Sequence, residues 1–445
     1  MLKSSVAGLD WPAVIDPRLA LVYGLFSQLQ RSQWLDPVAL RRQQSVQLAA
    51  RLNHAAQASA HYRPLLGAQR IAPQEAFAAL QTLAPLTRSD LQQNAQDLYC
   101  KVGPEHGAVS EKRTTGSTGQ PVTVQCTLAA FALREALTIR NYHWYQVRTD
   151  QLFAAIRAGL ATGQAQGVDK PNWGGAMARL FETGPSCGLG LEQPLAQQQA
   201  WLQAHKPAHL LTYPSNLRVL LDAIAQPWDG LLSVMCIGES VADELRADLR
   251  ARWGVPLFDQ YSSEELGSIA AQCSHGSYHT MAESLHVEVL REDGSACQPG
   301  EVGRVLVTDL YNFATAMLRY ELRDYAEVGV PCACGRKLPT LKRIVGRTRN
   351  RLTLPDGRKI WPSSGLRHFD QIPIRQFQLI QLSLEKLELR LQVARAVSAD
   401  EQQAIRAQVL KTIGHPFALD LQFYDVPLPK GPSGKFEQFV SMLAD

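Results

Sequence analysis

The chain has 445 residues, more than one hydrophobic core usually organises, so we expect two or more domains. Hydrophobic residues make up 45% and charged residues 19%, a balance typical of a well-packed globular protein and not of a disordered one. The net charge of +4 is small and the basic residues are scattered, so we expect no nucleic-acid-binding surface.

The sequence also predicts that the chain does not span a membrane. The apolar run at residues 19–26 is much shorter than the roughly 20 residues that a spanning helix needs. The N-terminus lacks the charged start, apolar run and cleavage site of a secretory signal. Eight dispersed cysteines fit reduced thiols or a metal site better than a disulfide framework. We therefore expect a cytoplasmic protein.

The predicted elements, taken in chain order, indicate an α/β fold. The first hundred residues have helical spacing, most clearly over 37–60, and a second helical pattern covers 128–147. Strands then alternate with helices, which predicts a mostly parallel sheet with covering helices. These strands are expected at 208–212 and 231–237, and the helices at 214–225 and 241–253.

Turn-rich and then α+β sequence follows. Residues 283–290 and 303–310 read as strands separated by Asp-Gly and Pro-Gly turns. Beyond about 350, regular alternation over 378–393, a helical pattern over 399–413 and a strand pattern over 417–424 describe a small separate unit. The expected organisation is a large domain of mixed and parallel sheets, 1–349, followed by a small mobile α+β domain, 350–445.

The sharpest local motif is Thr114-Thr115-Gly116-Ser117-Thr118-Gly119-Gln120-Pro121. Small and hydroxylic residues allow backbone N–H groups and hydroxyls to close around phosphate oxygens. The segment is not a P-loop, because its glycine spacing differs and no Gly-Lys-Ser/Thr ends it. A flexible surface loop is the alternative interpretation.

Four weaker motifs follow in order. In 259–267, Tyr261 could stack on an adenine and Glu265 could hold Mg²⁺, but this segment taken alone favours a solvated glutamate pair at a helix start. In 318–324, a carboxylate such as Asp324 can accept two ribose hydroxyls, but this segment in isolation favours a surface Arg/Asp pair. Residues 343–350 are charged and mark a composition change, and Gly434-Lys435 lies near the C-terminus.

The order and separation of these five motifs resemble those of the adenylate-forming superfamily, which includes acyl-CoA synthetases. Tyr261-Ser-Ser-Glu-Glu265 and Cys332-Ala-Cys334-Gly-Arg are closest to the phenylacetate–CoA ligase branch. The resemblance covers roughly residues 110–445, and the first hundred residues contribute little to it.

This resemblance implies an enzyme that uses ATP and Mg²⁺ to convert a carboxylic acid to an acyl-adenylate and then transfers the acyl group to a thiol. It implies phosphate binding by the 114–119 segment and adenine contact by Tyr261. Glu265 would hold Mg²⁺, Asp324 the ribose, and Arg347 would lie near the nucleotide. Lys435 would catalyse adenylation on a lobe that rotates about a hinge at Asn350. The residues of the phosphate segment are Thr114, Thr115, Gly116, Ser117, Thr118 and Gly119.

Three positions depart from the superfamily pattern. Gln120 stands where lysine is usual, which removes one cation facing the phosphates. Asn350 replaces the usual aspartate at the hinge and still tolerates unusual backbone angles. Glu264 replaces the usual threonine before the metal-binding carboxylate.

A zinc site is also expected, with Cys273, His279, Cys332 and Cys334 as ligands and His275 in reserve. Three thiolates and one imidazole suit tetrahedral Zn²⁺, and some members of this branch carry such an ion. Four protein ligands leave no open position, so the predicted role is structural. Unconnected buried cysteines are the alternative.

The acid pocket is expected to involve His143, Trp144, Tyr213, Gly238 and Glu239. Nearby aromatic side chains favour an aromatic acid, although they could equally be core residues. The sequence does not choose between CoA and the phosphopantetheine of an acyl carrier protein as acceptor, and a dimer is the expected assembly. An amide-forming ligase acting on an amino acid, or an inactive zinc-containing protein with this fold, are the competing interpretations.

Overall fold

The computed structural model describes residues 1–113, 121–160, 164, 166–347, 352–360, 372, 374–426, 428–429 and 439–443. The backbone divides into two compact units, Met1–Val345 and Gly346–Asp445, whereas the sequence placed the boundary between 349 and 350. Within the described residues, no helix is both long and apolar enough to cross a membrane.

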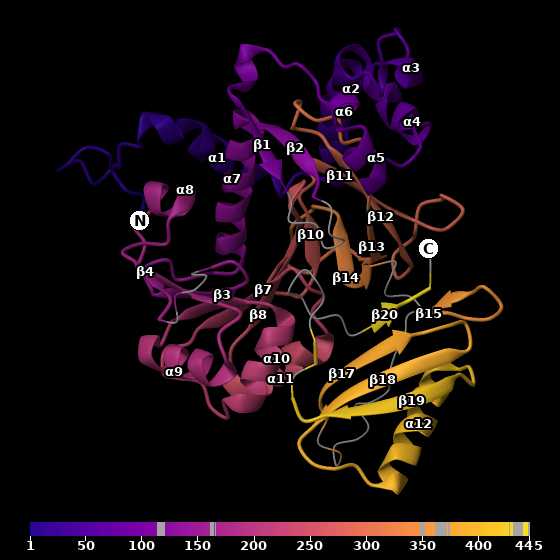
Figure 1. The fold of residues 1–445 in the computed structure, drawn as a ribbon. Coiled ribbons are helices and arrows are strands. Elements are labelled where there is room, and N and C mark those ends of the chain that lie inside the picture. Colours follow the sequence, from indigo (N-terminus) through magenta and orange to yellow (C-terminus); the bar gives the residue numbers. More distant parts are fainter. Residues whose placement is uncertain are drawn as a thin grey trace. The chain divides into compact units, whose positions relative to one another are not determined.

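The first unit is built on a twelve-stranded mixed sheet (Figure 1). Its strand order is β11-β12-β13-β14-β10-β9-β8-β7-β6-β3-β5-β4. These strands are β3 (Phe153–Arg157), β4 (Val168–Lys170), β5 (Ser186–Gly190), β6 (His209–Thr212), β7 (Ser233–Ile237), β8 (Leu257–Ser263), β9 (Gly267–Gln272), β10 (Tyr278–Thr280), β11 (Leu285–Leu290), β12 (Val302–Asp309), β13 (Tyr320–Val328) and β14 (Thr340–Arg347). A separate hairpin joins β1 (Val109–Arg113) to β2 (Thr123–Thr127).

The two halves of this sheet differ in strand direction. Strands β5, β3, β6, β7 and β8 are parallel, and β4 and β9 pair antiparallel at the two ends of this run. Parallel strands need crossover connections, which helices supply here. The alternation predicted over 208–253 is therefore confirmed as β6, α10, β7 and α11.

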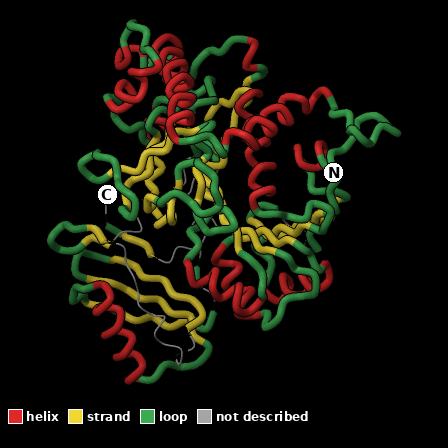
Figure 2. The backbone as a smooth tube through the Cα atoms, turned by 180° about the vertical axis from the view of Figure 1, so that it is seen from behind, coloured by secondary structure: helices red, strands yellow, loops and turns green. Residues whose placement is uncertain are grey.

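Eleven α-helices belong to the described part of the first unit. They are α1 (Ala20–Ser32), α2 (Pro37–Ala58), α3 (Arg63–Leu66), α4 (Ala76–Gln81), α5 (Arg88–Gln93), α6 (Ala95–Leu98), α7 (Leu128–Trp144), α8 (Gly175–Leu180), α9 (Leu195–His205), α10 (Pro214–Ala223) and α11 (Asp243–Trp253). Helices α9, α10 and α11 lie together beside the parallel strands in both views (Figure 1, Figure 2). They share a core with those strands, whereas α1, α2 and α7 pack into a second core with the antiparallel half.

The N-terminal helices hold the turn that follows β12. The guanidinium of Arg51, on α2, is fully buried and donates to the carbonyls of Asp309 (3.2 Å) and Thr315 (2.6 Å). The Tyr62 hydroxyl donates to the Leu318 carbonyl at 3.2 Å. Such bonds satisfy buried carbonyls that would otherwise be costly, so the first hundred residues are integral to this unit.

The second unit is a small α+β fold, as the sequence pattern predicts. Its four-stranded sheet has the order β19-β18-β17-β20, and a two-stranded ribbon precedes it. The elements are β15 (Leu352–Thr353), β16 (Lys359–Ile360), β17 (Ile374–Gln381), β18 (Lys386–Val393), α12 (Ala399–Ile413), β19 (Ala418–Tyr424) and β20 (Phe439–Ser441). Leu387, Leu389 and Leu391 are fully buried, so the alternation in the sequence marks the face of β18 that packs on α12. The expected α/β fold class is confirmed.

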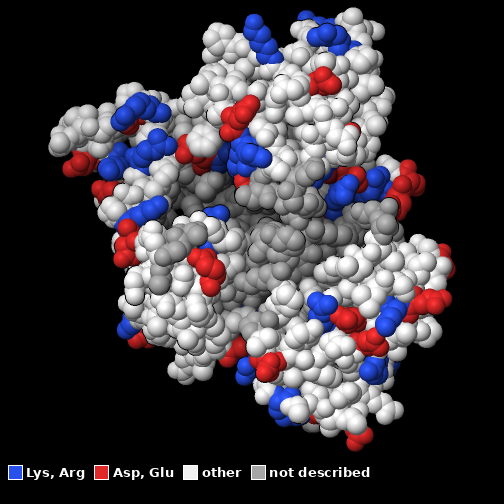
Figure 3. Space-filling view, viewed as in Figure 1, with Lys and Arg blue, Asp and Glu red and all other residues white. Residues whose placement is uncertain are grey.

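Charges on the described surface are mixed. Figure 3 shows Lys and Arg interspersed with Asp and Glu over the face in view, without a continuous basic stripe among the residues described.

Candidate functional site

The turn between β8 and β9 presents the glutamate that the sequence assigned to Mg²⁺. Glu265 is 6% exposed, and the next backbone N–H, of Leu266, donates to the Ser263 hydroxyl at 3.1 Å. Gly267 has φ +78°, a conformation that disfavours side chains, and this lets the chain reverse into β9. The segment is thus a strand-to-strand turn and not a helix start, so the solvated-helix interpretation of Glu265 is wrong.

Two arginines from distant elements meet at Glu265. Arg88, the first residue of α5, places Nη1 2.7 Å from Glu265 Oε1. Arg134, on α7, donates from Nη2 to the Glu265 carbonyl at 2.8 Å. Both arginine side chains are mostly buried, at 21% and 17% exposure, and Arg134 Nη2 also lies 3.8 Å from Asp309 Oδ2, so two arginines face two carboxylates at this turn. The neighbouring Glu264 is exposed and pairs instead with Lys112 at 2.9 Å.

The predicted adenine and ribose residues are in direct contact. The Tyr261 hydroxyl, on β8, donates to Asp324 Oδ2, on β13, at 2.8 Å. Burial raises the pKa of the Tyr320 hydroxyl, and the negative charge of Glu265 adds to this effect while Arg88 opposes it. Leu86, two residues before the Arg88 that pairs with Glu265, forms a β-bridge with Tyr320 at the start of β13, the strand that carries Asp324. Tyr261, Glu265 and Asp324 are therefore brought together by β8, its turn and β13.

Several predicted residues lie outside the described part of the chain. They are Thr114, Thr115, Gly116, Ser117, Thr118, Gly119, Gln120, Asn350 and Lys435. Arg347 is the last residue of β14, and its side chain is not described.

The five residues expected in the acid pocket fall into two groups. Glu239, after β7, accepts from the Ser215 backbone N–H (2.9 Å) and hydroxyl (3.0 Å) at the start of α10. Tyr213 immediately precedes this helix and is buried, and Gly238 adjoins Glu239 with φ +77°. These three residues follow the carboxyl ends of the parallel strands β6 and β7, where ligands of α/β sheets commonly bind.

His143 and Trp144 make their hydrogen bonds at the C-terminal end of α1, and their place in the acid pocket stays a prediction. His143 Nδ1 is 3.0 Å from Gln30 Nε2 of α1, and its ring contacts Phe26 edge-on. The Trp144 indole N–H donates to Gln33 Oε1 at 2.7 Å, and its ring lies edge-on to His279.

The predicted zinc ligands form a tight cluster. The ligand atoms of Cys273, His279, Cys332 and Cys334 all lie within 4.8 Å of one another. Cys273 Sγ is 3.6 Å from Cys332 Sγ, and Cys334 Sγ is 3.2 Å from His279 Nε2. His275 is exposed and is not part of this cluster. The unconnected-cysteine alternative is therefore wrong as a description of the geometry.

The protonation of this cluster suits a metal in part. Burial lowers the pKa of His279 to about 4, so the imidazole is neutral and can act as a ligand. Its Nδ1 faces the Leu338 carbonyl at 3.4 Å, which leaves Nε2 directed at the thiols. Burial opposes ionisation of Cys332, yet hydrogen bonds from Ser277 and the Cys334 backbone lower its pKa overall. Burial raises the pKa of Cys273 to about 12, so this thiol would need a bound cation to ionise.

A second group of metal-ligand types occurs at Asp169, Cys187 and His205. His205 Nε2 is 3.3 Å from Asp169 Oδ1, and the Asp169 side chain is 75% exposed. Burial raises the pKa of Cys187 to about 12, so the thiol is neutral. The geometry is that of a His–Asp surface pair beside a buried thiol.

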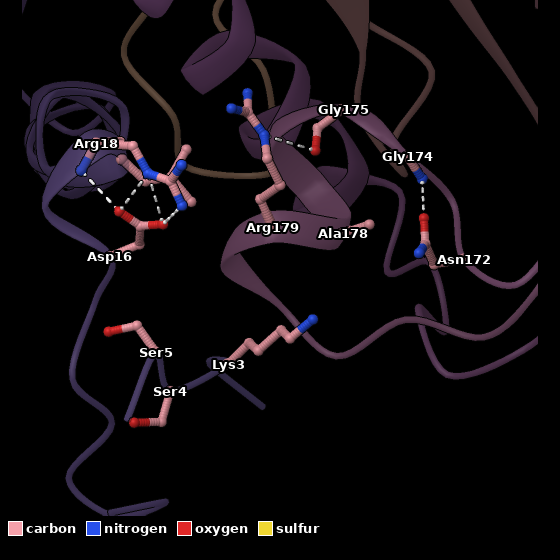
Figure 4. A pocket seen from close by; sticks show the side chains of 11 residues that line it. Lys3, Ser4, Ser5, Asp16, Arg18, Asn172, Gly174, Gly175, Ala178 and Arg179 are labelled. Carbon is pink, nitrogen blue, oxygen red and sulfur yellow. Dashed lines mark hydrogen bonds and ion pairs between the residues drawn. The ribbon is translucent and has the colours of Figure 1, made fainter. Parts of the chain in front are cut away.

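A cavity of about 400 Å³ opens between the N-terminal segment and α8 (Figure 4). Asp16 holds Arg18 through two hydrogen bonds from Nε at 3.1 Å, and Arg179 donates to the Gly175 carbonyl at 3.3 Å. No residue predicted for the nucleotide or acid site lines this cavity.

Sequence reasoning missed Arg88 and Arg134. The Thr87-Arg-Ser-Asp90 spacing signals a helix start and so places Arg88 in a first turn. Nothing local indicates that this turn lies beside a glutamate 177 residues further along the chain. Only the tertiary fold brings them together.

Comparison with solved structures defines the class of fold. The chain superposes on a 2-hydroxyisobutyryl-CoA ligase solved in the postadenylation state with 2-HIB-AMP, with a TM-score of 0.74, 16% identity and coverage of 93% of this chain and 91% of that one. An anthranilate CoA ligase, AuaEII, in complex with anthranoyl-AMP gives a TM-score of 0.54 at 16% identity, covering 74% and 64%. The protein therefore shares the fold of these CoA ligases, small C-terminal domain included, and the fold that the sequence resemblance implies is confirmed.

Sequence comparison gives one curated relative of interest. An uncharacterized acyl-CoA ligase, YhfT of Bacillus subtilis (strain 168), is 25% identical over 237 residues, which are 51% of this chain and 46% of that protein. The match thus spans about half the length of the relative. No protein-family model matches the chain.

Proposed function

We propose that the protein is an AMP-forming acid–thiol ligase that uses ATP and Mg²⁺. The observation that carries this proposal is the meeting of Tyr261, Asp324 and Glu265 around β8 and β13, three residue types that suit adenine, ribose and a phosphate-bound Mg²⁺ respectively. The adenylate-forming fold and the acyl-CoA ligase relative support the same conclusion.

In the proposed first step, a carboxylate oxygen of the acid attacks the α-phosphorus of ATP. The bond between the α-phosphorus and its bridging oxygen breaks, and pyrophosphate leaves with the electron pair. Mg²⁺ held by Glu265 would neutralise phosphate charge. The Thr114–Gly119 segment would bind the phosphates through backbone N–H groups and hydroxyls, Arg347 would adjoin the nucleotide, and Lys435 would stabilise charge between carboxylate and α-phosphate.

In the proposed second step, a thiolate attacks the acyl carbon and AMP leaves. The hinge at Asn350 would let the small domain, 350–445, withdraw Lys435 before the thiol enters, because two transition states share one cleft. Free CoA and the phosphopantetheine of a carrier protein present the same thiol arm. Either fits this chemistry.

The proposed acid is aromatic, of the kind used by phenylacetate–CoA ligases. Tyr213, Gly238 and Glu239 follow adjacent parallel strands and offer a wall for such a substrate. The proposed Cys273–His279–Cys332–Cys334 zinc site is structural, since it ties the β9–β10 hairpin to residues 332–334 with four protein ligands.

The test is exchange of labelled pyrophosphate into ATP in the presence of a panel of aromatic and aliphatic acids. We expect exchange that depends on one class of acid. Supplying CoA, a carrier protein or amino acids afterwards then identifies the acceptor, and an amide product would favour the amide-forming alternative. Lack of exchange across the whole panel would favour an inactive protein of the same fold.

A further inference from the structure

The phosphate-binding segment lacks a cation of its own. Residues 114–121 contain neither Lys nor Arg. Transfer of an adenylyl group builds negative charge on the leaving pyrophosphate, and fixed cations beside it are the usual source of stabilisation. The following inference rests on the proposed function and identifies the residue that supplies this charge.

Arg88 has the required position. Its Nη1 is 2.7 Å from Glu265 Oε1, so a Mg²⁺ bound at Glu265 and the phosphates around that ion would lie within reach of the same guanidinium. Glu265 is almost completely buried and the Arg88 side chain is 21% exposed, so the ion pair is largely shielded from water. Electrostatic interactions are stronger in such surroundings than in bulk solvent.

Arg88 is also held rigidly at its backbone. The preceding Thr87 accepts from the Asp90 N–H at 3.2 Å, and the Asp90 carboxylate accepts from the Thr87 N–H at 2.7 Å, which makes a reciprocal capping box. Leu86 joins β13, donating to the Arg319 carbonyl (3.1 Å) and accepting from the Glu321 N–H (2.8 Å). The start of α5 is thereby fixed to the strand that carries Asp324.

We propose that Arg88 binds the polyphosphate of ATP and stabilises the leaving pyrophosphate, in place of a lysine in the phosphate segment. Without nucleotide, Arg88 neutralises the buried Glu265 carboxylate. When Glu265 holds Mg²⁺, one guanidinium edge turns to phosphate oxygens, for which its planar, multidentate N–H groups are well suited. Arg134 keeps the turn in place through the Glu265 carbonyl during this exchange.

The test measures ATP binding directly, by titration calorimetry with Mg²⁺, together with melting temperature and pyrophosphate exchange. Loss of a hydrogen bond to a charged group predicts that Arg88→Gln weakens ATP binding by about ten- to a hundredfold. Arg88→Lys keeps the charge and should weaken it by about three- to tenfold. Arg304→Gln is the matched control, because Arg304 is 24% exposed and pairs with Glu321 at 3.3 Å without touching Glu265.

The decisive variant adds a cation back to the segment. If Arg88 supplies phosphate charge, Gln120→Lys should restore part of the ATP affinity lost in Arg88→Gln. An unchanged ATP affinity in Arg88→Gln would overturn the proposal and leave Arg88 as a support for Glu265.

Two further outcomes keep the test interpretable. If Arg88→Gln does not fold, then wild-type ATP affinity in Arg88→Lys overturns the proposal. If the wild-type protein itself neither binds ATP nor exchanges pyrophosphate, the proposed function fails. If the wild-type protein binds ATP and the Arg88 variants bind it with the same affinity, only the proposed role of Arg88 is rejected.

Discussion

The buried carboxyl group of Asp259 should make the stability of the protein depend on pH, and the environment of this residue sets the magnitude of the effect. This residue lies on β8, two positions before Tyr261, and is 4% exposed. Burial raises its pKa from 3.8 to about 6, against the opposing effects of a hydrogen bond from the Tyr278 hydroxyl (2.5 Å) and the charge of Arg246. Its other oxygen, Oδ1, is buried without a hydrogen-bond partner among the described residues.

The raised pKa makes the folded state hold this proton more tightly than the unfolded state. The stabilisation from the neutral carboxyl group is fully present below the unfolded pKa of 3.8 and is lost as the pH rises through about 6. The difference between the unfolded pKa of 3.8 and the folded pKa of about 6 corresponds to about 3 kcal/mol, of which roughly half is lost between about pH 5 and pH 7.5.

Asp259→Asn removes this proton linkage and keeps an acceptor for Tyr278. We expect its free energy of unfolding, relative to the wild type, to rise by about 1 to 2 kcal/mol between about pH 5 and pH 7.5. Urea unfolding followed by tryptophan fluorescence is suitable, because seven of the eight tryptophans precede residue 345 and so report on the unit that holds Asp259. A difference between the two proteins that stays constant with pH would refute the reasoning.

Three further predictions concern the proposed sites. Lys435→Ala should lower pyrophosphate exchange by about a hundredfold or more while ATP affinity stays near wild type, and an unaltered exchange rate would contradict this role. Elemental analysis should find about one zinc ion per chain in the wild-type protein, and Cys332→Ser should lower both this zinc content and the melting temperature. Wild-type protein without metal would reject the site. Tyr261→Phe should weaken ATP binding by about three- to tenfold, because Asp324 loses a hydrogen-bond donor, whereas Tyr278→Phe should affect stability alone.

The sequence determined much of the architecture because periodicity is a local property. The helix at 399–413 matches α12 at both ends, and the strand–helix alternation over 208–253 appears as β6, α10, β7 and α11. The alternating leucines of β18 predicted their own burial, since residues two apart in a strand share a face. The ligand types of the Cys/His cluster were also recognisable from their chemistry.

The tertiary structure decided which side chains meet. Arg88 and Glu265 are 177 residues apart, and only the joining of Leu86 to β13 and the turn after β8 brings them into contact. His143 and Trp144 were both expected in the acid pocket, and the packing of α7 brings them to Gln30 and Gln33 at the end of α1, with Trp144 also beside His279 of the zinc-ligand cluster. Local pattern fixes which face of an element is buried, but packing between distant elements selects the partner on that face, and the site is made from those partners.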